Sequence, residues 1–394
     1  MSTQDGVVDG ASPHVGREYQ SAPVAAARAG RQGTRRADLD SLRGHRGFVA
    51  LSAWAVAILL VLTRTSSWFW HDEWTFIRER SLTDPASWFL PHGEHFVAIH
   101  AAVYSALVAA FGTTTYLPYL AVTWAAHIAF VAAIYVLVDR HVGRGPALAV
   151  AAVLLVLGSA ALNLFWAFQM GPIASGAFAA WGLVVIREHP GRAVILMSLG
   201  VATGGFALFF IPAAALYGWS RRALLASAVP AVVYGAWYLV ERGAMVHYGP
   251  GIAIVPPIEW LPGGFVASID ALTGLGTLGV GLFVLALPLL LRVRDRRLAA
   301  LGILGLLTEY AILGLTRPGL NVPGGWQYVY FGAAFVALVF ASAWPAIPRW
   351  GRPATVGLAG LAVALNLLAL VTWSVAWPAV MAYSDPLCRL CVGP

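Results

Sequence analysis

The chain has 394 residues, of which 59% are hydrophobic and only 11% charged, and its mean hydropathy of +0.74 excludes an ordinary soluble protein. Apolar runs long enough to cross a bilayer recur along the chain, so we expect an all-α polytopic membrane protein. The net charge of +7 comes from 25 basic residues, all of them arginine, which gather at the ends of the apolar runs. Because arginine at span ends reports membrane topology, this charge does not indicate a nucleic-acid partner.

Residues 1–46 are rich in alanine, glycine, serine and arginine. They lack the apolar residues needed to bury a core, and no short apolar stretch with a cleavage site follows them. We therefore predict a disordered cytoplasmic tail rather than a secretory signal. Residues 47–394 are predicted to form the transmembrane domain, which contacts membrane lipids.

Eleven apolar segments are predicted to span the plasma membrane. With the N-terminus in the cytoplasm, 19 of the 25 arginines lie inside, seven in the tail and twelve in cytoplasmic loops. This bias supports the topology and puts the C-terminus outside. The predicted spans are residues 47–64, 117–138, 146–165, 171–187, 193–204, 205–219, 223–241, 274–291, 298–316, 327–344 and 354–377.

Two apolar stretches do not fit simple spans. A span at 96–112 would invert all the later loops, so we expect an outer interfacial or re-entrant helix with His100 and Tyr104 on one face. The stretch 193–219 is too long for one span and short for two. We expect two short helices that meet near Gly204, and such a break is tolerated only where it lines a cavity.

The first outer loop concentrates the ionisable residues. Asp72 and Glu73 stand directly after the first span, among tryptophans at positions 68, 70, 74 and 88. Those tryptophans are typical of an interfacial belt, although a sugar-stacking surface would use the same residues. A second polar group follows in the same loop, with the sequence His92-Gly93-Glu94-His95. Loops carry function more often than spans do, so this loop is the predicted site.

This order of features resembles the GT-C class of integral membrane glycosyltransferases, which includes protein O-mannosyltransferases and bacterial aminoarabinose transferases. The resemblance rests on a first span followed by Asp72-Glu73, an amphipathic outer stretch, an outer turn at 163–169 and a helix pair broken near Gly204. It covers residues 47–245, and the C-terminal helices in 246–394 are only loosely similar.

The resemblance implies transfer of a sugar from a polyprenyl-phosphate donor to a hydroxyl or amine of a lipid, glycan or protein acceptor, on the extracytoplasmic face. It implies a catalytic carboxylate at Asp72. Two departures leave donor and acceptor open: the turn 163–169 has no acidic residue, and Gly204 stands where the aminoarabinose transferases carry a lysine.

The chemistry requires a base for the acceptor. We expect Asp72 to be that base, with its pKa raised by partial dehydration at the membrane edge. Glu73 is expected either to orient the acceptor or to point away. The alternative is that both acids only solvate the loop or mark a helix start.

The remaining loop residues have ligand chemistry. We expect His71, His92, Glu94 and His95 to contact substrate. The last three also have side chains that suit a divalent metal, although their spacing matches no zinc signature, and no cofactor is otherwise indicated. They could equally contact a lipid phosphate or only make the loop polar.

Four predicted substrate contacts lie further along the chain. Arg317 could bind phosphate through its guanidinium fork, with interfacial snorkelling as the alternative. Glu309 lies inside a predicted span, where an acid usually faces a cavity or a partner. Gln169 could hydrogen-bond a sugar, with helix-end polarity as the alternative, and Tyr328 follows Arg317 on the same predicted outer side. We expect Gln169, Glu309 and Arg317 to share one pocket with the loop that carries Asp72.

Two other functions fit the same sequence. A transporter or flippase of a lipid-linked or small substrate would show broken helices in both halves, and the sequence indicates only the break near Gly204. A catalytically inert relative acting as a scaffold is the third reading. Cys388 and Cys391 could form a disulfide in the outer tail, and we assign them no role.

Overall fold

The computed structural model describes residues 45–64, 68–245, 255–316, 325 and 327–384. The chain divides into two units, Met1–Gly47 and Phe48–Pro394, and the functional residues all belong to the second. The predicted tail lies almost wholly outside the described residues. Arg317, Cys388 and Cys391 lie wholly outside them.

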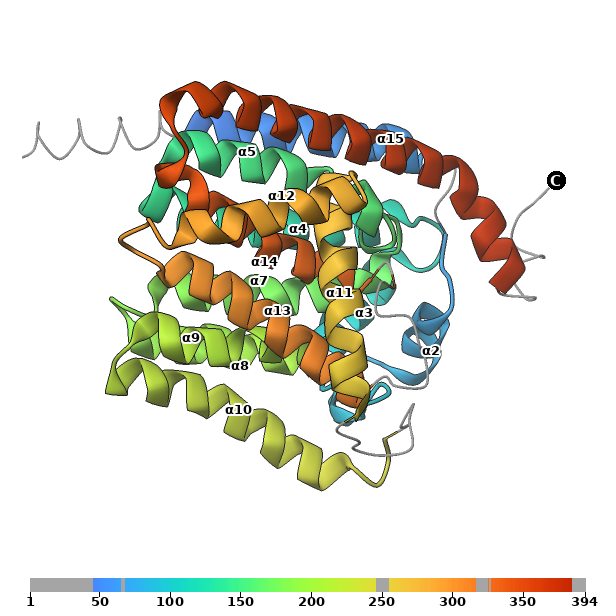
Figure 1. Cartoon of the computed structure of the whole chain (residues 1–394). Helices are drawn as coiled ribbons and strands as arrows, with labels where there is room; N and C mark the ends of the chain where they lie inside the picture. Colours follow the sequence, from blue (N-terminus) through green and yellow to red (C-terminus); the bar gives the residue numbers. More distant parts are fainter. Residues whose placement is uncertain (1–44, 65–67, 246–254, 317–324, 326, 385–394) are drawn as a thin grey trace, which may run out of the picture. The chain divides into compact units, whose positions relative to one another are not determined.

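The second unit is built from α-helices with short 3-10 segments, and the described residues contain no strand (Figure 1). The helices of the first loop are α2 (Asp72–Glu79), η1 (Pro85–Phe89) and α3 (Ala98–Phe111). The others are α4 (Leu117–Val142), α5 (Arg144–Leu155), η2 (Gly158–Ala160), α6 (Leu162–Phe165), η3 (Ala167–Gln169), α7 (Met170–Val185), α8 (Pro190–Thr203), η4 (Gly205–Phe210), α9 (Ile211–Gly218), α10 (Arg221–Glu241), α11 (Val255–Thr273), α12 (Thr277–Leu290), α13 (Arg297–Thr316), α14 (Val329–Ala343), η6 (Trp344–Ala346), η7 (Arg349–Gly351) and α15 (Arg352–Ser384).

Seven described helices are long and apolar enough to cross a bilayer, and there are eight if a bent pair counts as one span. The all-α, multi-pass class predicted from hydropathy is therefore confirmed. Every predicted span coincides with an apolar helix, but four of these helices are shorter than 18 residues. They are Arg144–Ala160, Pro190–Thr203, Gly205–Gly218 and Thr277–Leu290.

Close helix contacts depend on small residues, as is usual where helices pack in lipid. On α13, Gly302 and Gly305 lie one turn apart and face Phe335 of α14. A Cβ at Gly302 would overlap the Phe335 carbonyl, and one at Gly305 would overlap the Phe335 ring. The missing side chains therefore let α13 and α14 approach closely.

The predicted spans 223–241 and 274–291 leave residues 242–273 as an outer loop, and this is wrong in the second half, where α11 forms from Val255. This segment contains prolines and glycines that favour a loop in the sequence. Pro256 and Pro257 fall in the first helical turn, where proline is tolerated, and Gly264 allows close contact with the Tyr310 ring of α13. Helix α11 meets α12 at a bend of 101°.

The two stretches that did not fit simple spans have the predicted form. Helix α3 has 14 residues, about 21 Å, which is less than the hydrocarbon core of a bilayer. Helix α8 ends at Thr203 and η4 begins at Gly205. The Ser175 hydroxyl of α7 donates to the Gly204 carbonyl and accepts from the Ala207 N–H, so the polar backbone of the break is satisfied inside the protein.

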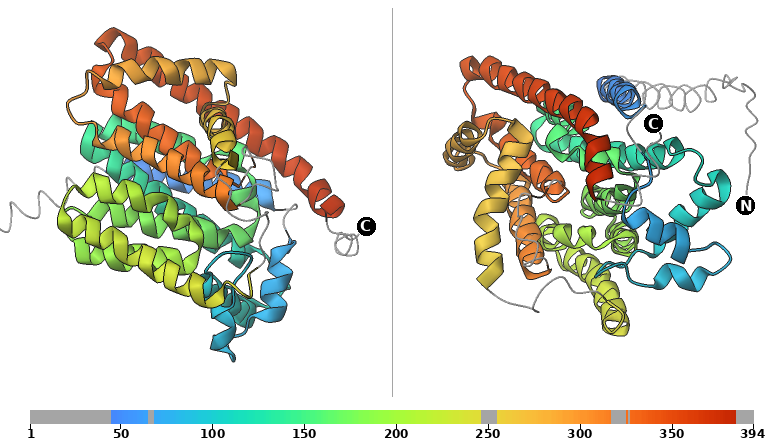
Figure 2. Two further views of the ribbon diagram at one scale, coloured as in Figure 1. Left: turned by 60° about the horizontal axis from the view of Figure 1, so that its bottom comes forward. Right: turned by 90° about the vertical axis from the view of Figure 1, so that its right-hand side faces the viewer.

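The first loop, drawn in blue and cyan in Figure 2, lies against the ends of α8 and α10. Helix α3 packs on α8, and the Trp237 indole of α10 donates to the Phe89 carbonyl at 3.3 Å. Of the predicted site residues of the loop, Glu94 and His95 lie beside the break that follows α8.

Candidate functional site

The acid pair divides between two environments. Helix α2 begins at Asp72, so both acids occupy the first turn, where negative charge interacts favourably with the helix N-terminus. Successive residues of a helix point about 100° apart. Asp72 keeps 30% of its side chain exposed, whereas Glu73 is completely buried. The two carboxyls therefore have different chemistry despite their adjacency.

Two imidazoles flank the Asp72 carboxylate. His71 Nδ1 lies 2.9 Å from Oδ1, and His92 Nε2 lies 3.6 Å from Oδ2. Burial alone raises the pKa of Asp72, but the hydrogen bonds and charges of His71 and His92 outweigh it and hold the pKa below its ordinary value. The expectation of a raised pKa is therefore wrong, because it took account of dehydration and not of the two histidines. Asp72 is ionised at neutral pH.

Glu73 is the centre of a buried polar network. Its carboxyl accepts hydrogen bonds from the Trp70 N–H at 2.8 Å and from the hydroxyls of Tyr104 and Tyr116 at 3.0 Å. Burial raises the pKa of Glu73 to about 8, although these hydrogen bonds act in the opposite direction. The Tyr116 hydroxyl also accepts from the Ala167 N–H. We expected Glu73 either to orient the acceptor or to point away. It points away from the open side, and its hydrogen bonds join α2 to α3 and to the start of α4.

The backbone at His71 is unusual. Its φ of 52° and ψ of −114° lie outside the regions that residues with a side chain normally occupy. The carbonyl of the preceding Trp70 accepts from the Trp166 indole at 3.2 Å, which helps to hold the chain in this conformation. Backbone strain that the surrounding structure maintains is typical of functional sites. Here it sets the His71 imidazole against Asp72, with 59% of the His71 side chain exposed.

In the turn from His92 to His95, the two histidine side chains point in different directions. His92 and His95 exchange backbone hydrogen bonds of 3.2 and 3.0 Å around Gly93, whose φ is +58°. His92 faces Asp72, while the His95 ring stacks on Phe206 of η4 with centroids 5.3 Å apart. The three predicted metal ligands therefore do not converge. Across the part of the chain that the structure describes, no three His, Cys, Asp or Glu residues form a metal-binding group.

A small cavity of about 40 Å³ separates this turn from the broken helix. Two predicted contacts of the turn, Glu94 and His95, line it together with Tyr328, which precedes α14. Thr316, at the end of α13, lines it as well, and Arg317 is the next residue along the chain. The other lining residues are Gly205, Phe206, Leu208, Phe209, Tyr234, Ile312 and Leu313.

The tryptophans of the loop contact other aromatic rings. Trp70 packs edge to face on Trp166 and Trp377, with centroids 4.8 and 5.3 Å apart. Trp166 in turn stacks on Phe168 at 5.1 Å. Aromatic packing inside the protein therefore accounts for Trp70, which is neither an open sugar platform nor only an interfacial anchor.

Two other predicted contacts do not line the cavity. Gln169 is buried and accepts a hydrogen bond from the Asn163 amide at 3.2 Å. Glu309 is completely buried in α13, with the Gly332 backbone of α14 beside its carboxyl. The single shared pocket expected from the sequence is therefore two adjacent clusters. One is formed around Asp72, and the other lies between the turn and η4.

Several residues of these clusters had no sequence signal of their own. Phe76 and Phe168 pack against the His92 ring, each at 5.2 Å, and against the ring of His100. Tyr234 donates to the Glu94 carbonyl at 2.8 Å from α10, 140 residues further along the chain. Only a map of helix contacts could have identified such partners.

Comparison of the chain with protein-family models, with curated proteins and with solved structures finds no match in any of the three.

Proposed function

We propose that the chain is a membrane glycosyltransferase that moves a sugar from a polyprenyl-phosphate donor to an acceptor hydroxyl or amine on the extracytoplasmic face. One observation carries the proposal. Asp72 is ionised, partly exposed and held between His71 and His92, and one rigid turn connects it to a cavity at a broken helix. We further propose that all eleven predicted segments cross the membrane, including the four that form short helices.

The acceptor would bind with its O–H or N–H donating to the open side of Asp72. As the acceptor atom forms a bond to the anomeric carbon, the bond from that carbon to the phosphate oxygen breaks. The bonding electrons leave with the polyprenyl phosphate. The acceptor proton passes to Asp72, and from there His71 or His92 can return it to water. Positioned bases contribute about 10²- to 10⁴-fold to the rate, and the lowered pKa of Asp72 puts its expected contribution at the lower end of that range.

At about 40 Å³ the cavity between the turn and η4 is too small to hold the donor, so in this proposal its wall contacts only the phosphate end of the donor, and the sugar and tail lie outside it. His95, Tyr234 and Tyr328 supply polar contacts at its wall, and Phe206 and Phe209 supply apolar ones. The phosphate end of the donor, which joins an anionic phosphate to an isoprenoid tail, needs both kinds of surface. In this proposal Arg317, which follows the cavity-lining Thr316, neutralises the leaving phosphate through its guanidinium fork.

The test is turnover by the purified full chain in proteoliposomes with a panel of polyprenyl-phosphate sugars. Release of polyprenyl phosphate and glycosylation of the acceptor would both be measured. Asp72→Asn should lower turnover at least about 100-fold. Asp84→Asn, which changes an exposed acid of the same loop, should stay within about twofold of wild type. Equal turnover by Asp72→Asn and wild type would overturn the proposal.

A transporter or flippase is the second candidate, and one observation favours it. Besides the break between α8 and η4, the C-terminal half contains the 101° bend between α11 and α12. Broken helices in both halves are typical of transporters. Glu309 is also a buried acid within an apolar helix. Lipid-linked sugar flipping that persists in Asp72→Asn, without transfer chemistry in wild type, would favour transport.

A further inference from the structure

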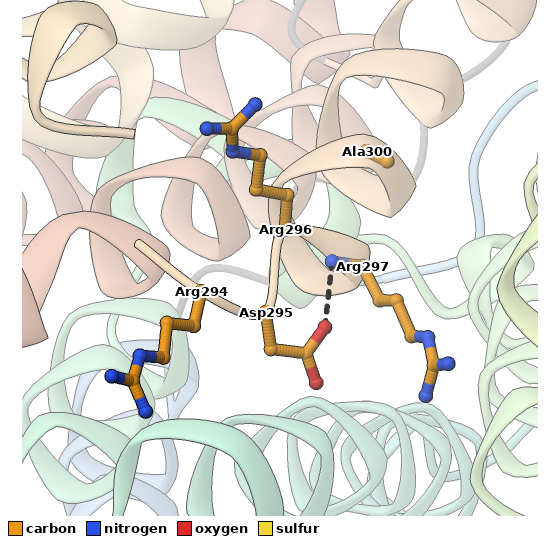
Figure 3. Close-up of a pocket in the computed structure, with 5 residues that line it drawn as sticks. All are labelled: Arg294, Asp295, Arg296, Arg297 and Ala300. Carbon is orange, nitrogen blue, oxygen red and sulfur yellow. Dashed lines mark hydrogen bonds between the residues drawn. The ribbon is translucent and has the colours of Figure 1, made fainter. Parts of the chain in front are cut away.

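A basic hollow lies at the opposite end of α13 from the cavity beside Thr316. It has a volume of about 460 Å³ and forms where the loop after α12 enters α13 (Figure 3). The α-helical rise places its first residue, Arg297, about 28 Å from Thr316. The predicted topology puts this end on the cytoplasmic side. The lining residues are Arg294, Asp295, Arg296, Arg297 and Ala300.

The three arginines of the hollow are not equivalent. The guanidinium of Arg296 already donates hydrogen bonds to backbone carbonyls just after α12, to Leu291 at 2.7 Å and to Val293 at 3.4 Å. Arg294 and Arg297 make no side-chain hydrogen bond or ion pair with any residue that the structure describes. Figure 3 shows their side chains on either side of Asp295, whereas Arg296 extends the other way.

Asp295 does not form an ion pair with the guanidinium group of Arg294 or of Arg297. Its Oδ1 accepts the Arg297 backbone N–H at 3.1 Å, and its Oδ2 lies 4.0 Å from His141 Nε2 at the end of α4. The carboxylate therefore fixes the first turn of α13. It holds the loop between Arg294 and Arg297 while its oxygens are directed to other groups.

Neighbouring helix ends carry charges of both signs. His141 lies 3.4 Å from the Tyr217 hydroxyl of α9, and Arg140 and Arg187 act on the same hydroxyl electrostatically. Glu188 lies 3.8 Å from Arg140. Arg140 and Arg187 therefore belong to helix ends near the hollow, together with Asp139 and Glu188, but they do not line it.

We propose that this hollow binds a phosphate-bearing anion, with Arg294 and Arg297 as its guanidinium donors. Arginine forks match phosphate oxygens bidentately, and the N-terminal N–H groups of α13 add favourable partial charge. The hollow is open to solvent and its arginines are exposed, and basic pockets at cytoplasmic helix ends bind anionic headgroups. The same chemistry fits a soluble phosphate. The site does not depend on the proposed transferase activity, since it uses none of the residues of the first loop.

The experiment uses the full chain purified in a neutral detergent. Binding of phosphatidylglycerol, phosphatidylcholine and inorganic phosphate would be measured by native mass spectrometry and by thermal shift. Wild type should retain phosphatidylglycerol and not phosphatidylcholine. Arg294→Gln with Arg297→Gln should weaken binding about 30-fold. Each arginine contributes about 1 kcal/mol to the binding of an anionic headgroup, and the sum of about 2 kcal/mol corresponds to this factor. Saturation by inorganic phosphate alone would identify a soluble anion as the source, and binding of phosphatidylglycerol alone would identify a lipid headgroup.

The matched control is Arg221→Gln with Arg222→Gln, which removes two exposed charges at the start of α10, outside the hollow. It should leave binding within about twofold of wild type. Equal losses in the two double variants would overturn the proposal, because they would indicate general attraction to anionic lipid, and so would no loss in either. Should the glutamine variant not fold, Arg294→Lys with Arg297→Lys keeps the charge without the fork. Weaker binding by this variant than by wild type supports the proposal, and equal binding overturns it.

Discussion

The clearest physical consequence of the structure concerns Glu73. This carboxyl is completely buried, and its pKa is raised to about 8 from an ordinary value of 4.5. The folded protein therefore holds the Glu73 proton more tightly than the unfolded chain does. Stability from this group is fully present below pH 4.5, declines as the pH rises, and is lost once the pH passes about 8. A shift of this size corresponds to about 4 to 5 kcal/mol across that window, as an upper bound.

Glu73→Gln should remove this pH dependence. A glutamine amide is neutral and nearly the same shape. Its oxygen can still accept from Tyr104 and Tyr116, while its NH2 group faces the Trp70 N–H and costs the same at every pH. We expect the unfolding temperature of the variant, relative to that of wild type, to be clearly higher at pH 8.5 than at pH 5. Glu73→Ala should be less stable at every pH, by about 2 to 5 kcal/mol, because it leaves a void and buried hydroxyls without their acceptor.

Thermal unfolding followed by tryptophan fluorescence, from pH 5 to 9 in one detergent, measures these differences. The difference between wild type and Glu73→Gln isolates the carboxyl, since every other titrating group is common to both. A constant difference across this range would refute the assignment of a buried, proton-binding Glu73. So would a wild type that gains stability over Glu73→Gln as the pH rises.

Three further predictions follow from individual contacts. His71→Gln with His92→Gln removes the groups that lower the Asp72 pKa, so the acid limb of the pH–activity profile should move to higher pH; an unchanged limb would show that the histidines do not act on Asp72. Gly171→Ala places a methyl group on the buried His100 ring and should cost about 1 to 3 kcal/mol in thermal unfolding, whereas Gly145→Ala, which has open space around it, should change little. Tyr330→Phe removes the 2.7 Å hydrogen bond to His127 Nδ1 between α14 and α4 and should cost about 1 to 2 kcal/mol by the same assay; no change would mean that the bond has no net effect on stability.

Hydropathy and charge bias predict the features of this fold that depend on the membrane. Each apolar segment is a helix, 96–112 contains the short α3, and the helix pair breaks at Gly204. The predicted spans missed α11, which contains Pro262 and neighbouring glycines, residues that are uncommon inside helices. Gly264 is compatible with a helix because the Tyr310 ring packs on it, and no local pattern contains that information.

In the candidate site, too, the local sequence predicts some features, and others depend on tertiary contacts. The composition of the first loop was sufficient to select Asp72, since few acids occur elsewhere on that predicted face. It could not separate Asp72 from Glu73, because the burial of Glu73 depends on Tyr116, 43 residues away. Nor could it predict that His92 and His95 face opposite ways, which follows from the backbone pairing of their turn. Residue type thus selected a candidate loop, and long-range packing determines the surroundings of each group in it.

The turn from His92 to His95 is the strongest structural argument for chemistry over transport. Its two reciprocal backbone hydrogen bonds fix the separation between the imidazole at Asp72 and the imidazole at Phe206. A transferase needs such a fixed separation, because acceptor and donor must be held together in one geometry for the displacement. A transporter instead needs the elements around its substrate to move relative to one another. The α8–η4 break is tied to α7 through Ser175 and to the first loop through His95, so motion there would disrupt the Asp72 cluster as well. The bend between α11 and α12 has no such connection to the first loop among the contacts described, and motion in a transport cycle would accordingly be expected at that bend.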